Sequence, residues 1–375
     1  MFMQGLHLKH CGMVQSEMDP CVYYRIMEDN KGLVSAYLVV ISWVDDCRYF
    51  GTADLVKQYE KDVVSHCKCT LEGEAKEFVS IQINNQLDKG ILELTQEDYW
   101  IKAVERFKEF LPADGPKERK VPLSPADERL LTEPTDEEMK EAEHLPYPNL
   151  LGVCQYPSSF SRLEMRYAMS ILSRWRTKWS VNHFKILVKA LEYGFTTRMM
   201  GLRYSANLSE KELNVLLGYA DSGFSVPRSQ GCRLVMMNGA AISLTSKRHT
   251  TTDDSTTSAE LTECYLCACD IVGFRELMAE VGLKQEDPTI IYQDNQSAIK
   301  IAMNRGSLAK KTRATEIRVF SIRNKIEDMK VVPIYLETTK MLADLGTKAL
   351  DPKLFCALRD VMCGYAKKAI LDKGQ

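Results

Sequence analysis

The sequence predicts an α/β protein made of several domains, and three observations lead to that prediction. The chain has 375 residues, which is enough for two or three domains that each bury a core. Short runs of β-branched and aromatic residues alternate with stretches whose apolar residues recur at helical spacing. Apolar residues make up 45% of the sequence and charged residues 27%, which excludes a wholly disordered chain.

The N-terminal third begins with a predicted hairpin. Residues 33–44 are rich in β-branched and aromatic side chains and predict a strand, and residues 47–51 predict its partner. Asp45 and Asp46 stand at the tight turn between the two strands. Ordinary turn chemistry is one explanation for two acidic residues at such a place.

A second hairpin and a helix follow. Strands predicted over residues 78–83 and 90–94 flank a turn expected at Asn84 and Asn85. Apolar spacing then predicts a helix over residues 98–110.

Residues 111–148 have the composition of a linker. Seven of the 13 prolines lie here, and acidic residues dominate residues 127–143. We therefore expect the segment to cross a surface with its charges in water. Thr135 and Glu138 form a capping-box pattern, which predicts one short helix.

Helices are predicted over residues 149–204. Ser161 and Glu164 form a second capping-box pattern. The apolar side chains that then fall on one helical face are Leu163, Tyr167, Ala168, Ile171, Leu172 and Trp175. A second helix over residues 181–193 is expected to end at Gly194, a residue type that often follows a helix.

The last third predicts a mixed sheet with helices on its faces. The predicted strands cover residues 216–224, 232–237, 241–246, 289–293 and 331–336. The predicted helices cover residues 257–281, 296–303 and 314–329, with two more near residues 342 and 354.

Four acidic residues in this last third stand among apolar neighbours, and they are Asp221, Glu260, Asp294 and Asp344. Asp294 and Asp344 could cap helices, and Glu260 could interact with a helix dipole. Asp221 lies inside an apolar strand, where a carboxylate needs a partner. If the fold gathers all four, their repulsion requires cations such as Mg²⁺, which prefers oxygen ligands. Two such ions can activate water for phosphodiester cleavage.

Four short motifs surround these carboxylates. They are residues 218–221 (GYAD), 255–261 (STTSAEL), 292–297 (YQDNQS) and 342–350 (LADLGTKAL). In this order they resemble the GYSD, SSTEAEY, YCDNQSA and LADIFTKAL boxes of copia-type retrotransposon Pol polyproteins. The resemblance covers nearly the whole chain and implies a ribonuclease H domain that degrades RNA in RNA–DNA hybrids. It implies Asp221, Glu260, Asp294 and Asp344 as catalytic and metal-binding residues, with Mg²⁺, or else Mn²⁺, as cofactor.

Two departures from the family pattern concern residues outside that quartet. Ser258 stands where the SSTEAEY box has its first Glu. Residues 313–321 (RATEIRVFS) lack both histidines of the family's KHIDIRYHF stretch.

The N-terminal third carries motifs of another enzyme. Residues 16–21 (SEMDPC), 43–46 (WVDD) and 90–96 (GILELTQ) resemble the SKADPC, YVDD and GIxLSQ motifs of the same family's reverse transcriptase. The resemblance makes Asp45 and Asp46 remnants of the polymerase metal site, whose first Asp belongs to a segment upstream of this chain. RNA-directed DNA polymerase activity is therefore not expected of this fragment without upstream Pol segments as partners.

Residues between these two parts resemble the segment that connects the two enzymes. Residues 171–175 (ILSRW) and 182–193 (NHFKILVKALEY) resemble the family's LLSRF and HWKALKRVLRYL helices. The predicted domains are therefore a partial reverse transcriptase with an α+β palm fragment (1–112), an acidic Pro-rich linker (113–148), a helical connection (149–206) and a ribonuclease H-like mixed sheet with flanking helices (207–368).

Lys and Arg crowd the stretch that follows Asp294. The predicted nucleic-acid-binding residues are Lys300, Arg305, Lys310, Lys311, Arg313 and Arg318. Such a patch can neutralise phosphates without reading base sequence, although a solvated helix face gives the same pattern. Weaker candidates on the connection helix, some of which are expected to face the acidic linker, are Arg162, Arg166, Arg174 and Arg176.

Three functional hypotheses follow. The first is Mg²⁺-dependent endonucleolytic cleavage of RNA in RNA–DNA hybrids by a retrotransposon-derived Pol fragment. The second is a decayed, non-catalytic remnant that at most binds nucleic acid. The third is one piece of a longer polyprotein whose polymerase activity is supplied upstream. The absence of signal-like and membrane-length apolar segments predicts an intracellular protein, cytoplasmic or nuclear, with no membrane partner.

Overall fold

The computed structural model of the chain describes residues 2–44, 46–303 and 313–367, with side chains from residue 316 onward in the last segment. The chain divides into two compact units. The first consists of Met1–Phe78 and Cys269–Pro288, and the second of Val79–Ala268 and Thr289–Gln375. Both units combine helices with β-sheet, which confirms the predicted α/β class.

A four-stranded antiparallel sheet forms the centre of the first unit. Its strands, in spatial order, are β1 (Val14–Gln15), β2 (Val22–Glu28), β3 (Val34–Trp43) and β4 (Asp46–Gly51). Leu38 and Val40 of β3 are buried together with Tyr59 and Val63 of α2 (Ala53–His66). The unit also contains α1 (Phe2–Gly5), a π-helical turn (Leu6–His10) and β5 (Glu77–Phe78).

The predicted hairpin of the first unit is confirmed on both sides of its turn. Trp43 at the end of β3 pairs with Asp46 at the start of β4. Val44 has a left-handed backbone φ of 53°, which is uncommon for a β-branched residue and marks a tight turn. Asp45 lies outside the described residues.

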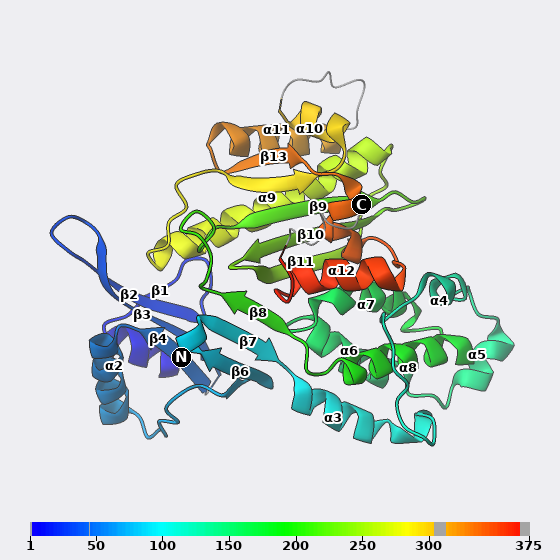
Figure 1. Ribbon diagram of the computed structural model, residues 1–375, viewed down its shortest axis with the longest axis horizontal. Helices are drawn as coiled ribbons and strands as arrows, with labels where there is room; N and C mark the ends of the chain where they lie inside the picture. The colour runs from blue at the N-terminus through cyan, green and yellow to red at the C-terminus, as the bar shows by residue number, and fades with distance from the viewer. Residues whose placement is uncertain (1, 45, 304–312, 368–375) are drawn as a thin grey trace. The chain divides into compact units, whose positions relative to one another are not determined.

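A mixed sheet of five described strands forms the centre of the second unit, in the order β11, β10, β9, β12, β13 (Figure 1). The strands are β9 (Leu217–Gly223), β10 (Gln230–Met237), β11 (Ala240–Arg248), β12 (Thr289–Gln293) and β13 (Val331–Tyr335). Strands β9 to β11 are antiparallel, whereas β12 runs parallel to both of its neighbours. This arrangement confirms the predicted mixed sheet.

Helices flank this sheet at the predicted places. Helix α9 (Thr256–Glu280) follows β11, and its part up to Ala268 belongs to the second unit. Helices α10 (Gln296–Ala302) and α11 (Arg313–Glu327) contact β13 (Figure 1). After the 3₁₀ turns Thr338–Lys340 and Leu342–Gly346 comes α12 (Pro352–Met362). The helix expected near residue 342 is thus a 3₁₀ turn.

A smaller antiparallel sheet of the second unit contains β6 (Ile81–Gln86), β7 (Ile91–Thr95) and β8 (Leu202–Ser205). The turn predicted at Asn84 and Asn85 is wrong, because both residues lie in β6 and Asn84 pairs with Glu93 of β7. The chain turns instead through Leu87–Lys89 and Gly90, whose left-handed φ of 59° glycine adopts without strain.

A helical layer contains the predicted connection helices. Its members are α3 (Glu97–Arg106), α6 (Tyr147–Ser158), α7 (Arg166–Leu172) and α8 (Val181–Thr196), with 3₁₀ turns at Lys108–Phe110, Leu163–Met165 and Ser173–Trp175. The predicted apolar stripe from Leu163 to Leu172 is buried, and Trp175 is half-buried.

The predicted linker segment packs on this helical layer. It contains α4 (Pro125–Arg129) and α5 (Asp136–Ala142), and the capping box of Thr135 and Glu138 is confirmed.

Several linker charges are bonded to the connection helices. Arg119 lies 2.7 Å from the buried Glu192, and Tyr167 donates a 2.5 Å hydrogen bond to Glu128. Some charged side chains of the linker therefore contact the connection helices, whereas the acidic composition had predicted that the charges lie in water.

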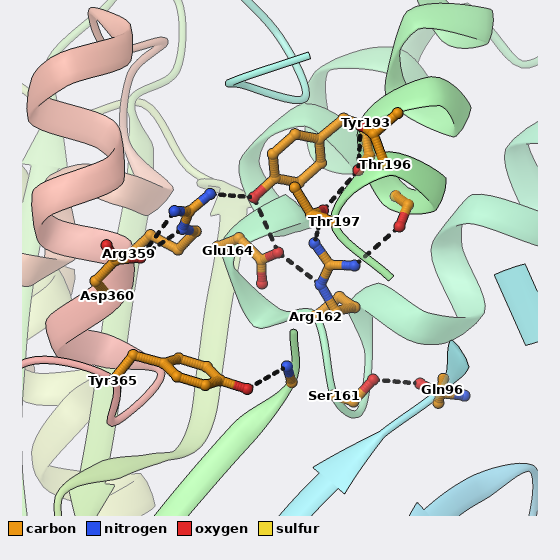
Figure 2. Close-up of polar contacts among 12 residues, drawn as sticks. Gln96, Ser161, Arg162, Glu164, Tyr193, Thr196, Thr197, Arg359, Asp360 and Tyr365 are labelled. Carbon is orange, nitrogen blue, oxygen red and sulfur yellow. Dashed lines mark hydrogen bonds and ion pairs between the residues drawn. The ribbon is translucent and has the colours of Figure 1, made fainter. Parts of the chain in front are cut away.

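The capping box predicted at Ser161 and Glu164 is not formed (Figure 2). Ser161 Oγ instead donates to Gln96 Oε1 at 2.7 Å, and Glu164 Oε1 accepts a 2.8 Å bond from Arg162 Nε. Arg162 is 0% exposed, so the prediction that it contacts nucleic acid is also wrong. The buried guanidinium requires a carboxylate partner, and it takes the side chain that would have capped the helix.

Gly194 lies inside α8 rather than after its end, so the predicted helix end is also wrong. A Cβ atom at this position would lie 2.3 Å from the ring of Trp100. The glycine therefore admits the indole ring into the core, and Arg162 donates a bond to the Gly194 carbonyl at 3.2 Å.

Across the described ranges, every helix is too short or too polar to cross a bilayer.

Candidate metal centre

The four predicted carboxylates come from four elements of the second unit. Asp221 lies in β9, Glu260 in α9, Asp294 directly after β12, and Asp344 in the 3₁₀ turn Leu342–Gly346. The parallel register pairs Tyr219 of β9 with Tyr292 of β12. Each aspartate follows its tyrosine by two residues, so the register brings Asp221 and Asp294 to adjacent positions.

Three of these side chains meet. One carboxylate oxygen each from Asp221, Glu260 and Asp294 lies within 4.8 Å of the other two. Asp221 and Glu260 are buried, with 6% and 4% exposure, and Asp294 is half-buried. Three buried or half-buried acids this close repel one another whenever they are ionised.

Helix capping does not explain these acids. Asn295, not Asp294, caps α10, because its Oδ1 accepts from the backbone N–H of Ala298 at 3.0 Å. Ser255 accepts from the backbone N–H of Ser258 at the start of α9. Glu260 lies beyond that first turn and is too buried to be a solvated helix-start charge.

Hydroxyl and ammonium groups bond to the outer side of the cluster. Thr347 Oγ1 donates to Asp221 Oδ2 at 2.6 Å, and Thr338 Oγ1 donates to Asp294 Oδ2 at 2.8 Å. Lys348 Nζ lies 2.8 Å from Asp344 Oδ1. These contacts fix side-chain orientation but supply only one positive charge.

The electrostatics of the cluster favour protonation. Burial, followed by the charges of Asp221 and Asp294, raises the pKa of Glu260 to about 9. Burial and the charge of Asp221 raise the pKa of Asp344 to about 7, although Lys348 acts in the opposite direction. Burial and Asp221 also raise the pKa of Asp294, against the hydrogen bond from Thr338. The cluster therefore contains too little positive charge to keep its carboxylates ionised, and a divalent cation would supply that charge.

The donor set suits a hard cation. All candidate ligand atoms are carboxylate oxygens, which Mg²⁺ and Mn²⁺ prefer. Glu260 Oε2 is buried and makes no hydrogen bond in the described part of the chain. A buried carboxylate oxygen without a donor is an available ligand atom. The residues present thus fit a divalent cation.

The structure describes only part of the predicted nucleic-acid patch. Lys300 is exposed on α10. Arg305, Lys310 and Lys311 lie outside the described residues, as does the side chain of Arg313.

Arg318 has partners within the fold. Its guanidinium donates to Thr262 at 2.8 Å and to Thr251 at 3.4 Å. Arg318 therefore ties α11 to α9 and to the segment before α9, an internal role that the charge pattern did not reveal.

Of the two polymerase-like aspartates, Asp46 is exposed at the start of β4 in the first unit. Asp45 cannot be placed beside it because it lies outside the described residues.

Sequence reasoning missed the groups that contact the cluster. Lys348 follows Asp344 by four residues, a spacing that was available as a signal for an ion pair. Nothing in the sequence marks Thr338 and Thr347 as contacts of the cluster, because threonine is common at turns. Their partners, Asp294 and Asp221, are also distant in sequence.

Comparison with known proteins finds transposon relatives over most of the chain, although no family model matches. The Pol polyprotein of the Nicotiana tabacum transposon TNT 1-94 is 24% identical over 344 residues, covering 90% of this chain and 25% of that protein. The Arabidopsis thaliana transposon RE1 polyprotein is 24% identical over 358 residues, covering 93% of this chain and 23% of that protein. A transposon Ty5-1 protein of Saccharomyces cerevisiae is 24% identical, covering 64% of this chain and 74% of that protein. The chain thus spans about a quarter of the length of the two polyproteins.

Solved structures give weaker similarity. LC11-RNase H1 in complex with an RNA/DNA hybrid is 11% identical, covering 34% of this chain and 88% of that chain, with a TM-score of 0.27. Foamy viral protease-reverse transcriptase in complex with an RNA/DNA hybrid is 13% identical, covering 80% of this chain and 36% of that chain, with a TM-score of 0.44. Both TM-scores are below 0.5, so the functional argument rests on the chain's own residues. The sequence relatives confirm that this chain resembles copia-type retrotransposon Pol polyproteins over most of its length.

Proposed function

We propose that the second unit cleaves the RNA strand of RNA–DNA hybrids with the help of divalent cations held by Asp221, Glu260 and Asp294, with Asp344 beside them. One observation carries the proposal, which is the convergence of three carboxylate oxygens from three elements to within 4.8 Å. A cluster of this kind is costly to the fold, so a function that requires it is the simplest reason for its presence.

The chain's own residues would bind the cations and orient the reacting groups. Asp221 and Asp294 each accept a hydrogen bond from a threonine hydroxyl, which fixes the orientation of both carboxylates. Glu260 contributes a buried oxygen that has no hydrogen-bond donor in the part of the chain that the structure describes. Bound Mg²⁺ would supply a water molecule of lowered pKa and stabilise charge on the leaving oxygen.

The substrate class is inferred from the four motifs, which resemble the ribonuclease H boxes of copia-type Pol polyproteins. An RNA–DNA hybrid is recognised through its shape, its 2′-hydroxyls and its phosphates. The exposed Lys300 on α10 follows Asp294 closely in sequence and could contact such a phosphate backbone. Polymerase activity is not part of the proposal, which concerns the second unit, whereas Asp46 of the polymerase-like motif lies in the first unit.

A second candidate is a remnant that binds nucleic acid without catalysis. The ion pair between Lys348 and Asp344 favours it, because this ammonium already neutralises part of the cluster. Protonation of Glu260 would neutralise another part. The acids could therefore persist without metal.

A cleavage assay separates the two candidates. Wild type, Asp294→Asn and the exposed control Asp328→Asn would be incubated with a labelled RNA–DNA hybrid and Mg²⁺. We expect cleavage by wild type and by the control, and a rate lower by about 10²–10³-fold in Asp294→Asn, the usual cost of losing one electrostatic group at a reacting centre. Equal rates in all three, or rates that do not depend on Mg²⁺, would contradict the nuclease proposal and favour the remnant.

A further inference from the structure

A second buried charged cluster lies between α9 and the β-sheet of the second unit. His249 Nδ1 lies 2.6 Å from Asp253 Oδ2, and His249 Nε2 lies 2.8 Å from Glu263 Oε1. The three side chains are between 2% and 4% exposed. The proposed nuclease site uses none of these residues.

The geometry indicates a doubly protonated imidazole. Each ring nitrogen faces a carboxylate oxygen, and an ionised carboxylate can only accept hydrogen bonds. Both nitrogens must therefore carry hydrogen if Asp253 and Glu263 are ionised. Burial alone lowers the pKa of His249, but the hydrogen bonds and charges of Glu263 and Asp253 outweigh it and raise the pKa.

The charged groups around His249 come from each neighbouring element. Arg233 of β10 lies 3.7 Å from Glu263 Oε2, so it partly balances that carboxylate. Arg318 of α11 bonds to Thr251, two residues after His249. With His249 protonated, His249 and Arg233 together balance Asp253 and Glu263. With His249 neutral, the cluster carries an unbalanced buried negative charge, which is costly.

The cluster joins three segments in a tight arrangement. His249 follows β11 directly, Asp253 lies in the connection to α9, and Glu263 lies on α9. A Cβ atom at Gly231 of β10 would lie 2.0 Å from Glu263 Oε1 and 2.6 Å from His249 Nε2. The side chains are therefore packed directly on the β10 backbone, and α9 cannot shift there without breaking these bonds.

Glu263 links this cluster to the carboxylate centre. It follows Glu260 by three residues, about one helical turn, and both side chains are buried. We propose that His249, held by Asp253 and Glu263, is a positioning residue that keeps Glu260 in place for divalent-cation binding, and that it does so only while both ring nitrogens are protonated. This inference rests on the proposed function, because it assigns a supporting role to that same site.

The inference predicts an unusual dependence of metal affinity on pH. Affinity for a carboxylate site ordinarily rises with pH as the ligands lose protons. The pKa of His249 is raised above its ordinary value, so the imidazole loses its second proton only at a pH above that at which the ligands ionise. Loss of this proton then releases α9. Metal affinity should therefore rise, pass through a maximum, and fall again.

The test measures Mn²⁺ binding to the full chain by electron paramagnetic resonance from about pH 6 to pH 10, a range that spans the ordinary pKa of histidine and values well above it. His249→Gln should bind Mn²⁺ more weakly, by up to the roughly 10–100-fold that the loss of a direct outer partner of a ligand costs, because His249 acts on Glu260 through Glu263, and it should show no fall at high pH. His183→Gln is the matched control, because His183 is also buried but caps α8 through Ser180. Its binding should equal that of wild type.

A second variant covers the case in which His249→Gln does not fold. Asp253→Asn keeps an acceptor oxygen for the ring but removes one charge, so the fall in affinity should move to lower pH. Nitrogen-15 chemical shifts of the His249 ring should report two protonated nitrogens at neutral pH.

Three outcomes would overturn the inference. An unprotonated ring nitrogen at neutral pH would contradict the geometry argument. Equal Mn²⁺ binding by wild type and His249→Gln would contradict the positioning role alone. The absence of Mn²⁺ binding by wild type at every pH would contradict the proposed function, and the positioning role with it.

Discussion

Two regions of the second unit bury charge, and they do so in opposite ways. The carboxylate centre gathers acids of like charge, with Lys348 as the cation in contact with it among the described residues. The region around Arg162 pairs opposite charges, because its guanidinium bonds to Glu164, Thr197 and the Gly194 carbonyl (Figure 2).

The comparison separates two uses of buried charge. Around Arg162 the buried positive charge has a carboxylate, a hydroxyl and a carbonyl of the chain as partners, so this charge is compensated, although Glu164 Oε2 is also buried without a hydrogen bond among the described residues. At the carboxylate centre Glu260 Oε2 has no donor among the described residues, and burial with the neighbouring acids raises the pKa of Glu260 to about 9. Incomplete compensation of this kind is typical of functional sites.

The largest effect on stability is expected from breaking the ion pair between Arg162 and Glu164. Arg162→Met should destabilise the second unit by about 3–5 kcal/mol, because Glu164 is left buried without its cation. Chemical denaturation followed by tryptophan fluorescence would measure it, since Trp100 lies next to Arg162.

Two controls define that effect. The double variant Arg162→Met with Glu164→Leu should lose less stability than Arg162→Met alone, because no unpaired charge remains. The exposed Arg176→Met should change stability by less than about 0.5 kcal/mol. If Arg162→Met were as stable as wild type, the ion pair between Arg162 and Glu164 would not be what stabilises this region.

A pH titration should reveal the opposite behaviour at the carboxylate centre. The folded pKa of Glu260 is raised to about 9, above the ordinary value of 4.5. Without metal, the folded state therefore holds a proton that the unfolded state has lost, and stability falls as pH rises from about 4.5 to about 9. The free energy of unfolding should fall by on the order of 1.4 kcal/mol per pH unit while the folded and unfolded states differ by one bound proton.

Glu260→Gln should remove most of that slope when unfolding is measured in the presence of a chelator. Asp344, whose pKa is raised from 3.8 to about 7, should leave a slope that ends near pH 7. The exposed Glu327→Gln serves as control and should behave as wild type. An unchanged slope in Glu260→Gln would mean that this residue does not carry the excess proton.

The smallest effect is expected from a methyl group added beside Arg162. Gly194→Ala places a Cβ atom 2.3 Å from the Trp100 ring and should cost about 1–3 kcal/mol through overpacking. Gly152→Ala is the matched control, because this helical glycine has open space around its Cβ position and should be neutral or stabilising. Thermal unfolding of the two variants measures the difference, and equal stability would indicate that the indole can move.

The sequence predicted those features that depend on neighbours along the chain. The strands of both large sheets follow from runs of β-branched residues, and the capping box at Thr135 uses residues three positions apart. The carboxylates of the candidate centre were predicted as a set because each lies in a short motif.

Features that depend on distant residues were not predictable in this way. Ser161 and Glu164 have a capping pattern, but their side chains form hydrogen bonds with Gln96 and Arg162 instead. Nothing local shows that Gly194 makes room for Trp100. His249 and Glu263 are 14 residues apart and belong to different elements, so no periodicity marks them as partners.

The Arg162 region also constrains the order in which the chain can fold during synthesis. Arg359 donates to Tyr193, 166 residues earlier, and the hydroxyl of Tyr365 accepts a bond from the backbone N–H of Gly201. The connection helices are made long before these partners leave the ribosome. Until α12 arrives, the site it will cover stays open to water and to other nascent chains, and contacts of such long sequence separation form slowly. The last helix of the unit therefore completes a core that the middle of the chain began.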